Sequence, residues 1–347
     1  MEKTSFGLIK YTSFNIGDEI QSLAASRFLP NIDYYINRER TDKFKSDQEE
    51  KVKVIMNAWW MWQSKHFPPS EDIDPLLISM HIQNGVRDSF FKNKAVKDYL
   101  IKYGPVGCRD KSTVDYFKSH GVDAYFSGCL TSTLLPNNNL KHKIISDYVL
   151  CVDVPKNIEV LIQKKSKLPV YNLSRFMTNA LVSKGRFELA KYMLFIYHNA
   201  SCVFTPCLHV GMPCLAFDTP VVLLKDKTMK DGNRFDGLDD YFNTADVSEF
   251  EQFLNDYDID NPVENSKAFL KMRENLVNRC KSFTGFDSEK SIFEDSYNPI
   301  LSLAEFLAYS KENEEKMLLC CTRTSLIKAT LKRIILGIDK FGFDYDS

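Results

Sequence analysis

The amino-acid sequence predicts an α/β protein with two parallel sheets, each covered by helices, and further helices at the carboxyl end. Three observations support this fold class. Apolar runs typical of buried strands alternate with amphipathic, helix-like runs along most of the chain. A polar stretch at 136–143 interrupts the alternation, which then resumes. The chain has 347 residues, of which 44% are hydrophobic, and is long enough for two domains.

The alternation predicts an amino-terminal lobe at residues 1–143, a second lobe at 144–298 and a helical extension at 299–347. In the first lobe we expect strands at 5–12, 34–36, 52–56, 76–80, 106–108 and 124–126. We expect one helix to begin at Gly17 and two others to cover 95–102 and 111–119. In the second lobe we expect strands at 148–152, 170–172, 202–204 and 220–224. We expect one helix to begin at Lys156 and three others to cover 187–197, 208–217 and 262–281. Helices are also expected at 300–311 and 325–338.

Composition excludes several classes of protein. A formal net charge of −1 argues against a generally basic nucleic-acid-binding protein, so we expect no nucleic acid partner. The nine cysteines include no CxxC pair, and several lie in apolar runs, which indicates reduced core residues of a cytoplasmic protein. We find neither a signal peptide nor an apolar run long enough to span a membrane. The histidines form no HExxH motif, so we expect no metal.

The most informative local feature is His209, at the start of the helix expected at 208–217. A short buried strand and the break Thr205-Pro206 precede this helix. The N-terminus of a helix attracts anions, and an imidazole adds a donor, a charge or a proton. The alternative is a histidine that only caps the turn.

A second anion-prone loop follows the first strand. Asn15 and Gly17 suit a tight turn, and Asp18 lies where an acidic side chain favours a helix N-terminus. The segment is neither a GxGxxG nor a P-loop motif. The alternative for Asp18 is a simple helix cap.

Arg109 is expected at the carboxyl end of the strand at 106–108. Ligands of open α/β sheets bind at that end of the strands. A guanidinium suits a carboxylate or a phosphate, and an ion pair with the neighbouring Asp110 is the alternative explanation.

Together these stretches resemble the polysaccharide pyruvyl transferase family. The resemblance covers about residues 5–245 and runs through Asn15-Ile16-Gly17-Asp18 with Gln21, Gly107-Cys108-Arg109-Asp110 with Thr113 and Gly121, Ser127-Gly128-Cys129-Leu130-Thr131, and Leu208-His209 with Pro220-Val221-Val222. It implies two Rossmann-like lobes that face a cleft, as in GT-B glycosyltransferases. It also implies phosphoenolpyruvate as the donor substrate, no further cofactor, and as acceptor a sugar of a cell-surface polysaccharide (exopolysaccharide or capsule) or of its lipid-linked oligosaccharide precursor.

The resemblance further implies which residues act. The family's donor-binding arginine, histidine and lysine fall on Arg109, His209 and either Lys225 or Lys227. We expect His209 to hold the phosphate and to donate a proton. The loop position and acidity of Asp18 make it the candidate base for the acceptor hydroxyl. The remaining candidate binding residues are Asn15, Gly17, Thr131, Leu208 and Arg234.

All three tryptophans lie at 59–62, just after an expected strand. An aromatic surface there matches the C–H face of a sugar, and Trp60 is our candidate for the wall of the acceptor site. The alternative is that the tryptophans fill the core, because large aromatic side chains contribute much of its burial energy.

The helix expected at 325–338 mixes aliphatic and cationic residues, which suits either contact with the inner face of an anionic membrane or packing on the core. Two rival functions share the predicted fold. One is a GT-B glycosyltransferase that uses a nucleotide sugar, since helix N-termini also bind diphosphates. The other is a catalytically silent scaffold in polysaccharide assembly.

Overall fold

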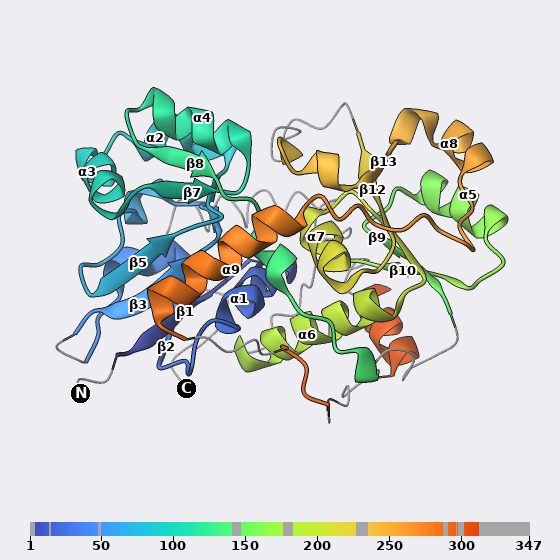
Figure 1. The fold of residues 1–347 in the computed structure, drawn as a ribbon, viewed down its shortest axis with the longest axis horizontal. Coiled ribbons are helices and arrows are strands. Elements are labelled where there is room, and N and C mark those ends of the chain that lie inside the picture. The colour runs from blue at the N-terminus through green and yellow to red at the C-terminus, as the bar shows by residue number, and fades with distance from the viewer. Residues whose placement is uncertain are drawn as a thin grey trace, which may run out of the picture.

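The structure is a computed structural model that describes residues 4–13, 15–47, 50–140, 147–175, 183–226, 235–286, 291–295, 297 and 302–311. It is an α/β structure in which every paired strand of the described residues is parallel to its neighbour, as the alternation predicts. Two main sheets lie side by side, with α1 (Gly17–Ser26) and α9 (Leu270–Thr284) between them in the view of Figure 1.

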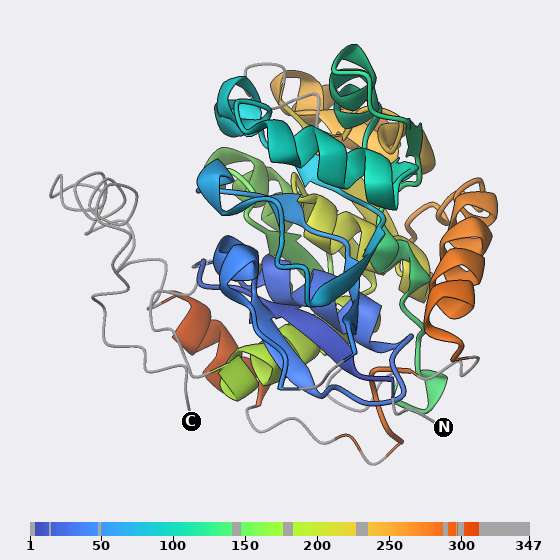
Figure 2. The same cartoon turned by 90° about the vertical axis from the view of Figure 1, so that its left-hand side faces the viewer.

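The first main sheet has the strand order β2-β1-β3-β5. Its strands are β1 (Phe6–Lys10), β2 (Tyr34–Asn37), β3 (Val52–Met56) and β5 (Ile73–Leu77). Two short parallel pairs continue this half, β4 (Trp59–Trp60) with β6 (His81–Ile82) and β7 (Val106–Cys108) with β8 (Ala124–Phe126). Helices α2 (Asn84–Phe90), α3 (Lys94–Tyr103) and α4 (Lys111–Ser119) lie above these strands in Figures 1 and 2.

The predicted bounds of the strand at 76–80 are wrong by three residues at each end. The observed β5 begins at Ile73 and ends at Leu77, because Ser79 has a positive φ of 52°, which extended backbone does not allow. Residues Ile73, Pro75 and Leu77 point inward, so the alternation that identifies this strand begins before the position that we predicted.

The second main sheet has the order β10-β9-β11-β12-β13. Its strands are β9 (Val149–Val152), β10 (Val170–Leu173), β11 (Cys202–Thr205), β12 (Val221–Lys225) and β13 (Asn243–Asp246). Its helices are α5 (Lys156–Lys165), α6 (Ser183–Asn199), α7 (Leu208–Phe217) and α8 (Phe250–Asp256). This order, with the first strand between the second and third, is that of doubly wound folds whose ligands bind where the connections diverge.

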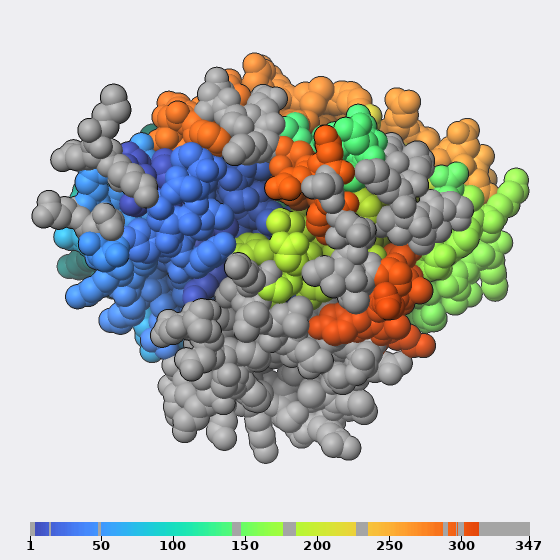
Figure 3. Space-filling view, turned by 90° about the horizontal axis from the view of Figure 1, so that it is seen from below, coloured from blue at the N-terminus to red at the C-terminus, as the bar shows by residue number. Residues whose placement is uncertain are grey.

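One hydrophobic core connects the two halves. It contains Ile20 and Leu23 of α1 together with Met193 of α6 and Val210 of α7, all at most 4% exposed. From below, the atoms of the first half and of α6 touch over a broad front (Figure 3). The predicted boundary at 143/144 therefore separates two sheets that share a core.

Helix α9 differs from the helix expected at 262–281, because it begins only at Leu270. The preceding segment is held extended by Asn265, whose side chain accepts a hydrogen bond from Val221 N–H and donates one to Thr219 O. Helix α9 belongs to the predicted second lobe, yet it packs on the 3₁₀ turn at Leu130–Thr133 of the first half.

The remaining predicted elements have mixed outcomes. The strands β3, β7 and β8 and the helices α4 and α7 have the predicted bounds, and a helix covers 303–311 within the one expected at 300–311. The helix expected at 325–338 lies outside the described residues. Within the described residues, no helix combines the length and the apolar character needed to cross a membrane.

Gly128 permits α9 to pack on the first half. It has a φ of +77°, and a Cβ atom here would overlap the side chain of Met272 of α9. We expect Gly128→Ala to lower the free energy of unfolding by about 2–4 kcal/mol through strain and overpacking. Gly285→Ala is the matched control, because Gly285 has a φ of +70° but no atom within 4 Å. Urea unfolding should show a smaller loss for the control, about 1 kcal/mol, and equal losses would contradict the role of the Met272 contact.

Candidate functional site

The switch points of the two sheets supply the candidate site. In the first sheet the chain diverges between β1 and β3, so the loop after β1 carries Asn15 and Asp18 to the carboxyl edge. In the second sheet the divergence lies between β9 and β11, and the turn after β11 leads to His209 at the start of α7. The two switch points meet in the structure.

Direct contacts join the first turns of α1 and α7. The side chain of Gln21 lies with its amide nitrogen 3.2 Å from Nδ1 of His209. The backbone of Gly17 packs on the same histidine, since a Cβ at Gly17 would lie 3.0 Å from His209 Cβ. Asn15 Oδ1 accepts a hydrogen bond from Gly17 N–H at 2.9 Å, which forms the tight turn predicted for this segment. This close approach of the α1 backbone to His209 explains why residue 17 is a glycine.

His209 is 8% exposed, and its side chain does not cap α7, whose first turn has no side-chain cap. With the amide nitrogen of Gln21 as donor, His209 Nδ1 accepts, so the proton of the neutral ring lies on Nε2. This tautomer gives the imidazole an Nε2–H that can donate to an anion.

Asp18 belongs to a buried network rather than to a cap. Its carboxylate accepts a hydrogen bond from the Ser13 hydroxyl at 2.5 Å and lies 3.4 Å from Nη1 of Arg38. Arg38 is fully buried, and Asp18 and Glu39 raise the pKa of its guanidinium despite the opposing effect of burial. At the start of α1 the side chain that accepts a backbone hydrogen bond is Asn15, from Gly17 N–H, and the described hydrogen bonds of the Asp18 carboxylate go to other side chains.

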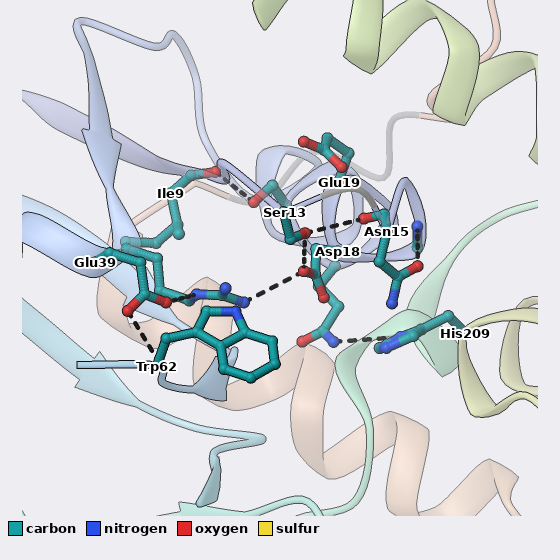
Figure 4. A network of polar contacts seen from close by, with 12 residues as sticks. Ile9, Ser13, Asn15, Asp18, Glu19, Glu39, Trp62 and His209 are labelled. Carbon is teal, nitrogen blue, oxygen red and sulfur yellow. Dashed lines mark hydrogen bonds and ion pairs between the residues drawn. The ribbon is translucent and has the colours of Figure 1, made fainter. Parts of the chain in front are cut away.

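The network continues to the tryptophan segment. Arg38 Nε lies 2.9 Å from Glu39 Oε1, and Glu39 Oε2 accepts hydrogen bonds from the backbone N–H of Trp62 at 3.0 Å and of Gln63 at 3.2 Å. The guanidinium of Arg38 also lies over the ring of Trp59. Figure 4 shows the Trp62 indole extending beneath the Arg38–Asp18 pair.

A second buried ion pair links the loop after β1 to α6. Arg186 Nε lies 2.6 Å from Glu19 Oε1, and its Nη2 donates to the backbone oxygen of Ser13 at 2.7 Å. Burial raises the pKa of Glu19 to about 7, even though Arg186 lowers it. Glu19 therefore changes charge near neutral pH.

Arg109 lies at the carboxyl end of β7, as predicted, and is 3% exposed. The alternative explanation, an ion pair with Asp110, receives little support from the distances. Arg109 Nε is 4.0 Å from Asp110 Oδ2, beyond hydrogen-bond range, and has no hydrogen-bond partner among the described residues. Asp110 instead binds His81 Nδ1 at 2.6 Å and caps α4 by accepting from Thr113 N–H.

Burial strongly lowers the pKa of His81, to about 4, and the charge of Arg109 lowers it further. Neutral His81 thus donates its Nδ1–H to Asp110. Burial alone would raise the pKa of Asp110, but the hydrogen bond and charge of His81, the charge of Arg109 and the hydrogen bond from Thr113 bring it below its ordinary value. The acid next to Arg109 is satisfied by these two donors.

Two further charged residues lie at the second switch point. Asp153, after β9, adopts a positive φ of 53° and lies 2.6 Å from Arg175 Nε. Arg175 follows β10, and its backbone oxygen accepts a hydrogen bond from Ile16 N–H just before α1. The second sheet thus contributes a guanidinium to the contact region.

Some predicted residues are placed elsewhere. Trp60 is fully buried and packs on Phe67, so the prediction that it forms the wall of the acceptor site is wrong. Trp59 is partly buried, and Trp62 is 47% exposed because it lies beyond the end of β4, where strand alternation no longer fixes the direction of the side chain. Leu208 and Thr131 are both buried, and Cys129 Sγ lies 3.1 Å from the Thr131 hydroxyl.

The structure describes only part of the segment that carries the predicted donor-binding lysines, Lys225 and Lys227. Lys225 is exposed at the end of β12 and pairs with Asp239 at 2.8 Å. Lys227 and Arg234 lie outside the described residues. The backbone oxygen of Asp236, just after that segment, accepts a hydrogen bond from Lys111 N–H at the start of α4. The loop after β12 therefore approaches the helix that follows Arg109.

Several residues of the site were missed by the sequence prediction. They are Arg38, Glu39, His81, Asp153, Arg175 and Arg186. Arg38, Glu39, Asp153 and Arg175 follow a strand directly or within two residues, which is the signal that could have identified them, whereas His81 lies within β6 itself. Arg186 has no such signal, because it lies on α6 and reaches the site only through the packing of α6 on α1.

The described cysteines are buried and form no disulfide with one another, at positions 108, 129, 151, 202, 207, 214 and 280. Burial raises the pKa of the Cys202 thiol to about 12, so this thiol stays protonated at neutral pH. Among the residues with described positions, no three His, Cys, Asp or Glu side chains are arranged to hold a metal ion.

Comparison with known proteins gives distant similarities only. No family model and no curated protein matches the chain. A functionally uncharacterised protein from Klebsiella pneumoniae is 16% identical over 70% of this chain and 93% of that chain, with a TM-score of 0.45. The UDP-GlcNAc 2-epimerase of Methanocaldococcus jannaschii, solved with UDP-GlcNAc and UDP, is 10% identical over 91% of this chain and 100% of that chain, with a TM-score of 0.37.

His81 should make the protein sensitive to acid. Its pKa is about 4 when folded and 6.5 when unfolded, so the unfolded chain binds an extra proton between these values. Stability is therefore lost as pH falls from 6.5 towards 4, with a slope of up to about 1.4 kcal/mol per pH unit. We expect His81→Asn, which keeps a donor for Asp110, to reduce this slope in urea titrations. An unchanged slope would contradict the low pKa.

Proposed function

We propose that the protein transfers the pyruvyl group of phosphoenolpyruvate to hydroxyl groups of a sugar in a cell-surface polysaccharide or its lipid-linked precursor. The products are a ketal and phosphate. The contact of His209 with the first turn of α1, where the two sheets meet, is the main support. The proposal includes two Rossmann-like lobes that face a GT-B-like cleft, with the donor held mainly by the second lobe.

The charge at Arg109 supports an anionic donor. A buried guanidinium without a close counter-ion is costly, because its desolvation is not compensated. Asp110 is occupied by His81 and Thr113, so it offers Arg109 little compensation. A carboxylate or phosphate beside Arg109 would supply the missing charge and hydrogen bonds. Phosphoenolpyruvate carries both groups.

The proposed chemistry assigns one proton transfer to each side of the site. In its imidazolium form, with Nδ1–H donating to the side-chain amide oxygen of Gln21, His209 gives its Nε2 proton to the methylene carbon of the donor and becomes neutral. An acceptor hydroxyl adds to the neighbouring carbon and gives its proton to Asp18. The bond from that carbon to the phosphate oxygen then breaks, and phosphate leaves with the electron pair. A second hydroxyl adds to the same carbon, its proton passes to the departing phosphate, and the ketal closes. Arg109 stabilises the negative charge throughout.

The exposed indole of Trp62 is the proposed acceptor wall. Its ring packs edge-on against Trp59, which lies under the guanidinium of Arg38, and Glu39 fixes its backbone. A sugar stacked on this ring would hold its hydroxyls near the candidate base. Arg38 would hold the Asp18 carboxylate in place, which makes Arg38 a positioning residue.

Donor binding tests the proposal first. We expect phosphoenolpyruvate to raise the melting temperature, and UDP or CMP to leave it unchanged. Arg109→Ala and His209→Ala should fold, lose this protection, and lower acceptor-dependent phosphate release by about 10²–10³-fold. Lys156→Ala is a matched control, because Lys156 lies on α5 with its side chain 77% exposed.

The opposite results identify the rival functions. Protection by nucleotides alone would favour a nucleotide-sugar glycosyltransferase. Absence of any ligand protection would favour a non-catalytic scaffold. Full activity in a folded Arg109→Ala or His209→Ala variant would contradict the assignment of donor-binding residues.

The acceptor wall makes a separate prediction. Replacing Trp62 by Ala should raise KM for the glycan about three- to tenfold, an effect of roughly 0.7–1.4 kcal/mol, with little change in donor protection. Trp62→Phe should restore most of the affinity, because the aromatic face remains. An increase in the KM for phosphoenolpyruvate instead would place the indole on the donor side.

A further inference from the structure

A cavity of about 510 Å³ lies beside α9, outside the network that joins His209 to Asp18. Its walls come from the end of β8, from the 3₁₀ turn at Asp239–Tyr241, and from one face of α9. All of these lining residues are described. In Figure 1 α9 runs diagonally between β8 and α7, so the cavity belongs to the seam between the two halves.

Helix α9 presents a polar face to this cavity. Lys271, Asn275, Asn278 and Arg279 line it, and positions four, seven and eight residues apart lie on one side of a helix. Eight residues of helix extend about 12 Å, so the two cations lie at opposite ends of the face with the amides between them. The residues that line the cavity include no acidic side chain.

Aromatic side chains form the facing wall. Tyr125 and Tyr241 both line the cavity, and the guanidinium of Arg279 stacks over the Tyr125 ring at 4.4 Å. A stacked guanidinium keeps its orientation and directs its N–H edge sideways, which is the geometry that binds a phosphate through two hydrogen bonds.

We infer that this cavity binds a phosphorylated sugar, with the phosphate at the stacked guanidinium of Arg279, the sugar ring between the tyrosines and the asparagines of α9, and Lys271 adding positive charge at the other end. Tyrosine rings match the apolar face of a sugar, and amides both donate to and accept from hydroxyls. The excess of two positive charges selects an anionic glycan over a neutral one. The inference rests on the proposed function, in which such a group belongs to the acceptor.

The position of the cavity supports a role for the acceptor. Ser127 lines it, and its hydroxyl donates to the backbone oxygen of Cys108, the residue before Arg109. Tyr241 lies on the turn whose Asp239 pairs with Lys225. The cavity therefore adjoins the loops that carry two of the predicted donor-binding cations, where a distal part of a long acceptor would extend.

Calorimetric titration of the full chain tests this inference. The probes are hexose 1-phosphates, the corresponding neutral methyl glycosides, and inorganic phosphate. We expect saturable binding of at least one hexose 1-phosphate, with neutral glycoside and free phosphate at least about tenfold weaker, which corresponds to about 1.4 kcal/mol for each. The Lys271→Ala/Arg279→Ala variant should lose at least about tenfold in affinity.

Lys267→Ala is the matched control, since Lys267 is an exposed lysine near the start of α9 that does not line the cavity and pairs with Asp218. Circular dichroism melting of each variant verifies folding, and both cations lie on the exposed face of α9, where substitutions have small effects on stability. Donor protection by phosphoenolpyruvate should persist in all three proteins.

Three outcomes would overturn the inference: no saturable binding of any hexose 1-phosphate, equal affinity for free phosphate, or unchanged affinity in the double variant. Such results with phosphoenolpyruvate protection intact would leave the proposed function standing. Binding of a hexose 1-phosphate at the cavity without any phosphoenolpyruvate protection would instead support the cavity and contradict the proposed donor.

Discussion

The contact between the first turns of α1 and α7 determines how the two parallel sheets meet. Gly17 allows the backbone of α1 to touch His209, and Gln21 orients the imidazole from the same helix face. Both helices follow a strand at a switch point, so this single contact brings together the two edges at which open α/β sheets bind ligands. A larger residue at position 17 would push the edges apart.

Buried guanidinium groups organise the region around this contact. Arg38, Arg175 and Arg186 each lie within 3.4 Å of a carboxylate, whereas the nearest carboxylate to Arg109 Nε is 4.0 Å away. Paired charges fix loop geometry, because breaking one partner leaves the other desolvated and uncompensated. The three paired arginines therefore hold the loops in place. Arg109, which lacks so close a carboxylate, is suited to an incoming anion.

The sequence predicted the parallel α/β architecture, most element bounds, and the two loops, after β1 and β11, that meet. Apolar periodicity and strand ends carry that information locally. It did not predict that Trp60 is buried while Trp62 is exposed, because β4 ends at Trp60 and the direction of the chain beyond it depends on contacts outside the strand. It also did not predict Arg186 or the start of α9, since the packing of α6 on α1 and the Asn265 hydrogen bonds are contacts between distant segments.

The continuous apolar core beneath the two sheets has a consequence for the mechanics of the molecule. Enzymes with separately packed lobes close on their substrates by rotating one lobe as a rigid body. Here such a rotation would shear interdigitated side chains of α1, α6 and α7, which a close-packed interior resists. Opening of the molecule is then confined to short surface segments, and the exchange of a bound ligand should depend on solvent viscosity only as far as these segments move.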